Sequence, residues 1–248
     1  MKRFHKSLVS HSALAVITIL AAIVGGGAAP LHPEQLNEKL RQYVTSRVGE
    51  FDTIPEQRRD QLRKLSSYIR DQTKNNRQAR LVFICTHNSR RSQMCQLWGA
   101  TAGAYFGVPH VETFSGGTEV TAFNSRAVAA LRRAGFDIDA PATTQNPRYR
   151  VRFHGDGPAV DCFSKVYRDP TNPKTDFCAV MTCSQADKSC PVVAGAAERI
   201  AIPFDDPKEF DGTPHETMKY DERCAQIARE LLFVFSEIRS TAVSSVPR

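Results

Sequence analysis

The chain has 248 residues, of which 41% are hydrophobic and 24% are charged, and this balance provides enough apolar side chains for a folded core. Its formal net charge of +7 suits a protein that binds anions, but the excess is too small to indicate a nucleic-acid-binding protein. The seven cysteines cannot all pair within one chain, and their spacings lack the short paired pattern of a structural zinc site, so they indicate thiol chemistry or burial.

The first 29 residues are predicted to be a signal peptide or a signal anchor. They start with a basic stretch that contains Lys2, Arg3 and Lys6, and an apolar run at 13–24 follows. Small residues after this run would allow cleavage, and the run is short for a membrane span. The alternatives are an over-extended start that the cell does not use, or a local amphiphile.

Residues 30–79 are predicted to be a helical extension that ends in a polar connector. Apolar residues recur at helical spacing in two places, with a break between them at 52–56. The repeating residues are Leu36, Leu40 and Tyr43 in the first helix and Leu62, Leu65 and Ile69 in the second. Nothing in this pattern indicates chemistry, so we expect a helical hairpin that packs on the domain formed by residues 80–240.

The stretch from Leu81 to Ser92 predicts a strand, a loop and the start of a helix. Four apolar residues lead into Cys85, and five residues separate this cysteine from Arg91. Such a loop can wrap its backbone N–H groups around a tetrahedral oxyanion, while the positive end of the helix faces the same point. Arg91 can hold two oxygens of the anion, and the Ser92 hydroxyl can stabilise Cys85 as a thiolate. The candidate anion-binding residues are Thr86, His87, Asn88, Ser89, Arg90, Arg91 and Ser92. The alternative, a buried structural cysteine, would not need the polar residues that follow it.

A second strand and helix come next. Residues 111–115 are predicted to be the strand, 116–117 its turn, and Asn124 the cap of a helix that ends near Gly135. Two strand–helix units predict a parallel sheet with helices on both faces. Ligands of such sheets bind beyond the carboxyl ends of the strands, which is where Cys85 lies.

Residues 140–175 are the least regular part of the sequence, with several Pro and Gly turn signals around a strand-like piece at 149–153. Two interpretations stay open for this segment. It forms a flap over the active site, with Phe163, Lys165 and Tyr167 as contacts, or it is a surface excursion without a role.

A later apolar strand ends at Cys183, which predicts that this thiol lies at the same sheet edge as Cys85. Cys190 follows seven residues later. If the residues between them form a helix, the two Cα atoms are about 10 Å apart, which exceeds the roughly 7 Å limit for a disulfide. Joining the two thiols would therefore require this segment to unwind. The alternative is two unrelated buried thiols.

The last part of the chain adds a short strand that ends before Asp206 and Pro207, a final helix at 216–239 and a flexible tail at 241–248. Pro207 fixes the loop after Asp206, but an Asp-Pro pair by itself is a weak signal, because most such pairs are turns. Three further thiols are predicted to be core or packing residues: Cys95, Cys178 and Cys224.

The loop from Cys85 to Ser92 resembles that of the low-molecular-weight protein tyrosine phosphatase superfamily. The pattern Cys-Ser-x-Ala-Asp-x-x-Cys-Pro, which starts at Cys183, is similar to the resolving-cysteine segment of thioredoxin-coupled arsenate reductases built on that fold. The resemblance covers about residues 80–240. It implies an α/β fold with a central parallel four-stranded sheet and helices on both faces, preceded here by the helical N-terminal extension.

The order of the motifs also matches this superfamily, in which the cysteine loop follows the first strand and the general acid lies near the end. The resemblance therefore implies that Asp206 is the general acid. Two residues depart from the family pattern. His87 stands where a glycine is common, and Arg90 is an extra cation beside Arg91.

The resemblance implies an arsenate reductase. Cys85 would attack arsenate, Cys183 and then Cys190 would take over the oxidation as disulfides, and external thioredoxin would reduce the last one. No metal or bound cofactor is implied. One alternative is a phosphatase that hydrolyses phosphotyrosine or other phosphomonoesters through a phosphocysteine intermediate. The other is a non-catalytic oxyanion-binding module.

The two indications of location disagree. The segment at 1–29 predicts export or membrane attachment, whereas a relay of thiols needs a reducing compartment such as the cytoplasm. The location therefore stays open at this point.

Overall fold

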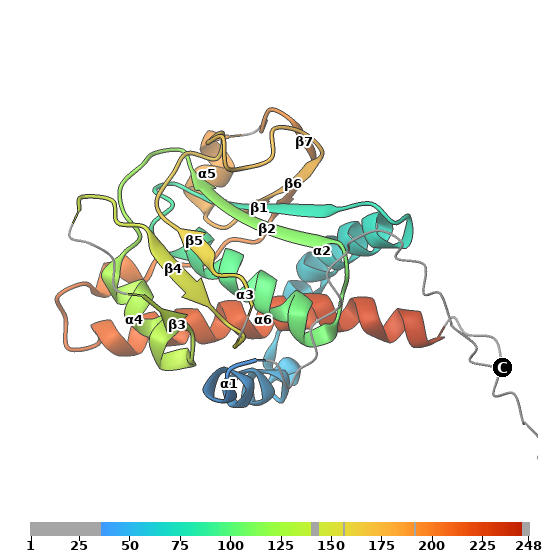
Figure 1. The fold of residues 1–248 in the computed structure, drawn as a ribbon, viewed down its shortest axis with the longest axis horizontal. Helices are drawn as coiled ribbons and strands as arrows, with labels where there is room; N and C mark the ends of the chain where they lie inside the picture. Colours follow the sequence, from blue (N-terminus) through green and yellow to red (C-terminus); the bar gives the residue numbers. More distant parts are fainter. Residues whose placement is uncertain (1–35, 140–143, 156, 191, 245–248) are drawn as a thin grey trace, which may run out of the picture.

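The computed structural model describes residues 36–139, 144–155, 157–190 and 192–244 (Figure 1). The predicted signal segment at 1–29 and the last four residues of the predicted tail lie outside these ranges. Within them, no helix combines the length and the apolar content that a membrane crossing needs.

A parallel sheet of four strands forms the centre of the fold. The strands, in their order across the sheet, are β2 (Val111–Gly117), β1 (Ala79–Cys85), β6 (Phe177–Met181) and β7 (Ala196–Ala201). Nearly every residue of β1 is buried, which is typical of a parallel strand with both faces covered. The predicted four-stranded parallel sheet is confirmed.

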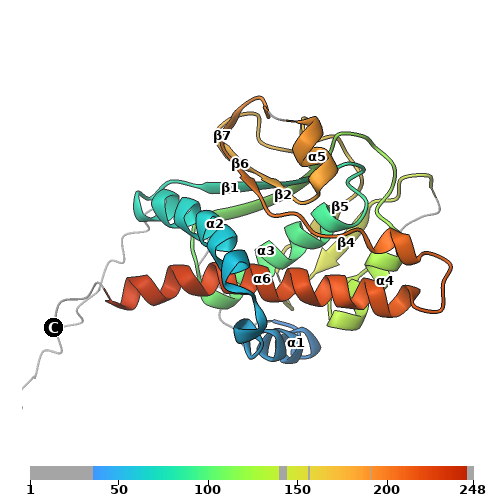
Figure 2. The same cartoon turned by 180° about the vertical axis from the view of Figure 1, so that it is seen from behind.

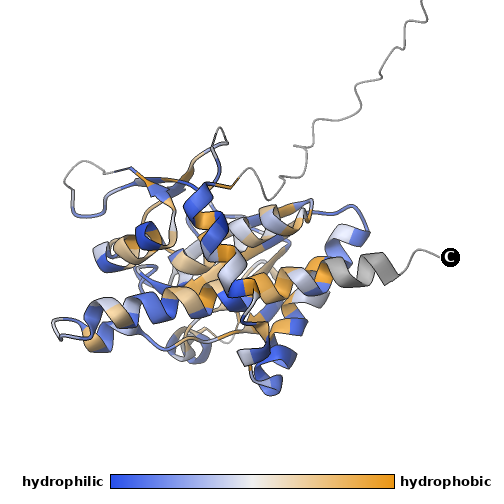
Figure 3. Ribbon diagram, turned by 90° about the horizontal axis from the view of Figure 1, so that it is seen from below, coloured by the Kyte–Doolittle hydropathy of each residue, from blue (hydrophilic) through white to orange (hydrophobic). Residues whose placement is uncertain are grey.

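Helices cover both faces of this sheet (Figures 1 and 2). Helix α3 (Arg91–Phe106) contacts β1 and β2 on one face, and the long helix α6 (Glu216–Ser244) packs against α3. The short helix α5 (Ser184–Ser189) contacts β1 and β6 on the other face. Apolar and hydrophilic residues alternate along α6, as expected for a helix with one buried side (Figure 3).

The side chains of β1 divide between the two faces. Leu81 and Phe83 belong to the large core that includes residues of α3 and α6. Val82 and Ile84 belong to a smaller cluster with Ala186 of α5. This alternation follows from the two-residue period of a strand. It ends at Ile84, because Cys85, the last residue of β1, belongs to the smaller cluster as well.

Two helices precede the first strand, where the apolar spacing predicts them. They are α1 (Glu38–Val48) and α2 (Glu56–Lys74), joined by the 3-10 helix η2 (Phe51–Thr53). Both pack against α6, and α2 also contacts β1 and β7 (Figure 2). The predicted apolar positions Leu40, Leu62, Leu65 and Ile69 are buried.

Helix α4 (Ser125–Ala134) begins and ends as predicted. The side-chain oxygen of Asn124 accepts hydrogen bonds from the backbone N–H groups of Arg126, at 3.0 Å, and Ala127, at 3.3 Å. Gly135 follows the helix with a φ of +112°, a conformation that glycine adopts without strain.

The prediction of a turn at 116–117 is wrong. Gly116 and Gly117 are the last residues of β2 and pair with Ile84 and Cys85 of β1. A β-carbon at Gly116 would lie 2.3 Å from the Cα atom of Tyr167. The two glycines are therefore required by the close approach of another backbone segment and not by a turn.

A second, antiparallel sheet lies beside the first. It consists of β3 (Asp137–Ile138), β4 (Tyr149–Arg152) and β5 (Val160–Cys162), in that order. The sequence predicts only the middle strand, because the outer strands have two and three residues and leave no measurable alternation. This sheet leads directly into the segment at 163–175, which packs next to the cysteine loop.

Candidate active site

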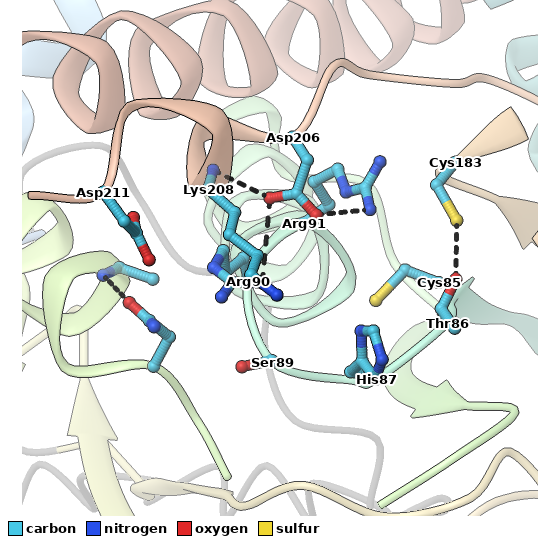
Figure 4. A network of polar contacts seen from close by, with 12 residues as sticks. Cys85, Thr86, His87, Ser89, Arg90, Arg91, Cys183, Asp206, Lys208 and Asp211 are labelled. Carbon is cyan, nitrogen blue, oxygen red and sulfur yellow. Dashed lines mark hydrogen bonds and ion pairs between the residues drawn. The ribbon is translucent and has the colours of Figure 1, made fainter. Parts of the chain in front are cut away.

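A small hollow lies at the carboxyl end of the main sheet, where the sequence predicts an anion site (Figure 4). Its lining consists of Cys85, His87, Ser89, Arg90, Arg91 and Asp206. Cys85 is the last residue of β1 and Arg91 the first of α3, so the loop between them surrounds the hollow at the amino end of a helix. The structure thus brings the predicted cysteine, arginine and aspartate together.

The Cys85 thiol lies against a hydroxyl group. Its sulfur is 3.0 Å from Oγ of Ser92, and the amide Nδ2 of Asn88 donates to the same oxygen at 2.9 Å. Since the Asn88 amide uses Ser92 as an acceptor, the proton of the Ser92 hydroxyl can point to the Cys85 sulfur. Ser92 is fully buried, so water does not compete for this contact.

Asn88 supports the loop from inside. It has a φ of +46°, a left-handed conformation that asparagine tolerates better than most residues. Its Oδ1 accepts from Nε2 of Gln93, at 3.2 Å, and from the backbone N–H of Lys165, at 2.9 Å. The side chain of Asn88, one of the predicted anion-binding residues, is therefore placed behind the loop and not in the hollow.

The segment at 163–165 holds the back of the loop. Gln93 Nε2 donates to the carbonyl of Phe163 at 2.8 Å, and Ser164 Oγ donates to the carbonyl of His87 at 2.9 Å. Lys165 is 4% exposed, so it is not at the surface. The interpretation as a surface excursion is therefore wrong for Phe163 and Lys165, and neither residue lines the hollow.

Arg91 and Asp206 form an ion pair beside Cys85 (Figure 4). The terminal nitrogens of Arg91 donate to Oδ2 of Asp206, at 2.7 Å, and to the carbonyl of Phe204, at 3.0 Å. The other carboxylate oxygen of Asp206 accepts from the backbone N–H of Lys208 at 3.1 Å, at the start of η3 (Pro207–Phe210). Nε of Arg91 is buried and has no hydrogen-bond partner among the described residues. Arg91 lines the hollow, so this donor is a candidate for binding an anion there.

Arg90 is fixed by a residue that the sequence does not indicate. Its Nε donates to the hydroxyl of Tyr220 at 3.0 Å, and this hydroxyl donates to Asp211 at 2.8 Å. Burial raises the pKa of Tyr220 to about 12, so the phenol stays neutral. A terminal nitrogen of Arg90 lies 3.7 Å from Asp206, which gives that carboxylate a second cationic neighbour.

Three other loop residues occupy the edge of the site. His87 lies 3.3 Å from the carboxylate of Glu119 and its side chain is 38% exposed. Ser89 donates to the carbonyl of Ala122 at 2.7 Å, and Oγ1 of Thr86 lies 3.6 Å from the sulfur of Cys183. The structure places all three around the loop, but only His87 and Ser89 line the hollow.

Cys183 and Cys190 stand at the two ends of α5. The Cys183 sulfur accepts from the N–H of Ala186 at 3.3 Å, and this thiol belongs to the same buried cluster as Cys85. Cys190 follows the last residue of α5 and is half-buried. The segment between the two thiols is helical. A helix of this length keeps the Cα atoms of Cys183 and Cys190 too far apart for a disulfide.

Arg199 holds the end of α5. Its guanidinium donates to the carbonyl of Asp187 at 2.7 Å, to the carboxylate of Asp187 at 2.6 Å and to the carbonyl of Cys190 at 3.1 Å. The sequence gives no signal for this residue, because it lies on β7 and meets α5 only in the folded chain. These contacts would have to break for the helix to unwind.

The other four cysteines are buried and have raised pKa values. Burial raises the pKa of Cys162 and of Cys224 to about 12, and it also raises the pKa of Cys95 and Cys178. Cys178 lies in the large core, across the sheet from the cluster of Cys85, as the strand period predicts. All seven thiols are free.

The described residues contain no group of three or more His, Cys, Asp and Glu side chains arranged to hold a metal ion.

A groove of about 450 Å³ adjoins the hollow. It shares His87, Ser89 and Arg90 with the hollow and extends over residues 121–125 to Lys208. None of its lining residues is acidic, so a negatively charged or neutral group is the better match for this groove.

Fold and site together define an α/β protein with a cysteine-containing anion loop at the carboxyl edge of a parallel sheet. No family model matches the sequence. The chain is 32% identical over 127 residues to an arsenate reductase of Brevibacillus brevis, which covers 51% of the chain and 75% of the relative. It is 29% identical over 136 residues to an arsenate reductase of Halalkalibacterium halodurans, which covers 55% and 79%. The chain belongs to the low-molecular-weight protein tyrosine phosphatase superfamily of enzymes, in which these arsenate reductases are its relatives.

Solved structures with a similar chain path include the YwlE arginine phosphatase of Geobacillus stearothermophilus, with a TM-score of 0.42, 13% identity and coverage of 68% of this chain and 99% of that one. An arsenate reductase in the phosphate-binding state has a TM-score of 0.41 and 16% identity, and the match covers 64% of this chain and 98% of that one.

Proposed function

We propose that the protein is an arsenate reductase that uses Cys85 as nucleophile and Cys183 and Cys190 as resolving thiols. The observation that carries this proposal is the position of Cys183. Its sulfur lies 3.6 Å from Thr86, the residue next to Cys85, and both thiols belong to one buried cluster. A hydrolase that relies on water would not need a second thiol at this point.

In the first step the Cys85 thiolate attacks arsenic, and a sulfur–arsenic bond replaces one arsenic–oxygen bond. The oxygen leaves with a proton from Asp206, and Arg91 and the loop amides hold the remaining oxygens. The ion pair between Arg91 and Asp206 would open when the anion enters, because both groups then face the substrate.

In the second step the Cys183 sulfur attacks the Cys85 sulfur. A Cys85–Cys183 disulfide forms, and the electron pair of the sulfur–arsenic bond goes to arsenic, which leaves as arsenite. Cys190 then attacks Cys183 and frees Cys85 as a thiolate. Because α5 keeps Cys183 and Cys190 apart, this last step requires the helix to open, and the resulting disulfide would pass to a dithiol reductant of the thioredoxin class.

The second candidate is a phosphomonoester hydrolase, in which water releases phosphate from Cys85. The groove beside the hollow favours it, since arsenate alone would not fill a space of about 450 Å³. Under this alternative Cys183 and Cys190 would protect Cys85 from irreversible oxidation.

Replacing Cys190 separates the two candidates. Cys190→Ser should abolish repeated arsenate reduction with thioredoxin, while hydrolysis of an aryl phosphate stays close to the wild-type rate. Cys178→Ala is the matched control, because its thiol lies across the sheet from Cys85 and should leave arsenate turnover intact. Arsenate turnover that persists in Cys190→Ser would exclude the relay.

A further inference from the structure

We propose that Arg58, on helix α2 before the first strand of the sheet, is a positioning residue for Asp206 and Arg91. It would act by fixing the backbone at Pro203 and Phe204. This inference has a mechanical part, the hold of Arg58 on the backbone, and a catalytic part, its effect on proton delivery. The catalytic part rests on the roles proposed above for Asp206 and Arg91, whereas the mechanical part does not.

Arg58 joins three separate parts of the chain. Its Nε donates to the carboxylate of Glu230, on α6, at 2.8 Å, and a terminal nitrogen lies 2.7 Å from the same carboxylate oxygen. That terminal nitrogen also donates to the carbonyl of Pro203 at 3.1 Å. The guanidinium carbon lies 5.0 Å from the centre of the Phe204 ring.

The same backbone segment holds the candidate catalytic residues on its other side. The carbonyl of Phe204 accepts from Arg91 at 3.0 Å, and Asp206 follows two residues later. The N–H of Phe204 donates to the carbonyl of Thr182 at 3.1 Å. Arg58 therefore bonds to the carbonyl of Pro203 and packs on the ring of Phe204. The carbonyl of Phe204 in turn fixes Arg91.

The environment makes this contact stronger than a surface ion pair. The side chain of Arg58 is 15% exposed and that of Glu230 is 4% exposed, so solvent screens the pair little. Only the planar fork of an arginine can hold a carboxylate and a carbonyl and also stack on a ring. Arg63, on the same helix, has a side chain that is 40% exposed and contacts Glu237, Glu56 and Asp60 instead.

A catalytic acid contributes most when its position is fixed before the reaction. Without the hold on Pro203, the segment that carries Asp206 would have more freedom, and Arg91 would lose a fixed partner. We expect the loss to appear in proton delivery to the leaving group. This assigns a role to helix α2, for which the sequence indicates no chemistry.

The mechanical part is tested by backbone hydrogen exchange of the full chain. Removing Arg58 alone would leave the Glu230 carboxylate buried and unpaired, so Glu230→Gln is the reference and Arg58→Met with Glu230→Gln is the test variant. The amides of residues 204–206, 208 and 209 should exchange about tenfold faster in the test variant, the loss expected for one hydrogen bond to a charged group. Arg63→Met should leave these amides unchanged. Equal exchange in the reference and the test variant would overturn the proposal.

The catalytic part is tested by a double-mutant cycle with Asp206→Asn. In the Glu230→Gln background, the Arg58→Met change should lower kcat/KM for an aryl phosphate with a poor leaving group about tenfold when Asp206 is present. It should have little further effect when Asp206 is already replaced, because the two changes act on one step. The same tenfold loss in both backgrounds would show a general loss of structure and overturn the positioning role. If the wild type shows no turnover that depends on Cys85, the proposed function fails, and hydrogen exchange still decides whether Arg58 holds the segment.

Discussion

The hydroxyl oxygen of Ser92 lies 3.0 Å from the sulfur of Cys85 and accepts a hydrogen bond from the amide of Asn88 at 2.9 Å. The amide thereby orients the hydroxyl, whose single proton is left for the sulfur. Cys85, Asn88 and Ser92 are thus arranged so that a negative charge on Cys85 gains a hydrogen bond without any movement.

Replacing Ser92 by alanine should slow the reaction of Cys85 with iodoacetamide at pH 7 about tenfold, since a hydrogen bond to a charged group contributes about 1.5–3 kcal/mol. The rate is measured by mass spectrometry of the modified peptide. Ser89→Ala is the control, because this hydroxyl bonds to the carbonyl of Ala122. Equal rates for both variants would remove Ser92 from thiolate stabilisation.

Asp206→Asn should slow the cleavage of aryl phosphates most when the leaving group is poor. An activated phenolate leaves with little protonation, whereas a poor leaving group needs the proton of the acid. The dependence of kcat on the pKa of the leaving phenol should therefore become steeper. A loss of equal size for good and poor leaving groups would reassign Asp206 to structure, for instance as the partner of Arg91.

Stability should fall above about pH 9. Burial raises the pKa of Cys162 and Cys224 to about 12, from an ordinary value of 9.0. Between pH 9.0 and about pH 12 these thiols have lost their protons in the unfolded chain but still hold them in the folded chain. The free energy of the unfolded state therefore falls relative to that of the folded state. The stabilisation is therefore complete below pH 9 and is lost as the pH rises towards 12. Urea unfolding in the presence of a reductant at pH 8 and pH 10.5 measures the difference.

Cys162→Ala provides the control for this pH dependence. The variant removes one of the titrating thiols, so its stability should decrease less between pH 8 and pH 10.5 than that of the wild type. An identical decrease in both proteins would assign the effect to other groups, such as Tyr68, whose pKa burial also raises to about 12.

Gly116→Ala should destabilise the fold by about 1–3 kcal/mol, the usual cost of forcing atoms into a packed region. Its new methyl group would lie 2.3 Å from the backbone of Tyr167, which cannot move without disturbing the bridge between β2 and the segment at 163–175. Gly155→Ala serves as control, since no atom lies within 4 Å of the position of its new carbon. Comparable stability of the two variants would contradict the close-approach explanation.

The sequence predicts the parts of the site that depend on neighbouring residues. The step from an apolar run to Cys85, followed by Arg91 at a fixed spacing, is local, and so is the cap at Asn124. The role of Asp206 is implied by the resemblance, through its place before a proline near the end of the chain. The structure brings Cys85, Arg91 and Asp206 to one hollow, as these patterns indicate.

The parts that the sequence does not predict depend on distant contacts. Paired glycines usually mark turns, and the backbone of Tyr167 that makes Gly116 necessary lies 51 residues further along the chain. Tyr220 and Arg58 have no motif, because each acts through contacts to residues far away in the sequence. Gln93 offers a weak signal, as a polar residue within a helix that is buried on most sides.

The hydrogen bonds behind the cysteine loop also bear on how the protein is made. Ser164 and Lys165 bond to residues that precede them by 77 positions, and Phe163 accepts from a residue 70 positions earlier. A nascent chain that ends before residue 163 would contain β1, α3 and β2 but none of these contacts. Because domains begin to fold during synthesis, the anion loop would remain unfinished on the ribosome until the second sheet and the segment after it had emerged. The Cys85 thiol would therefore gain its final surroundings late, after β1, α3 and β2 have been made.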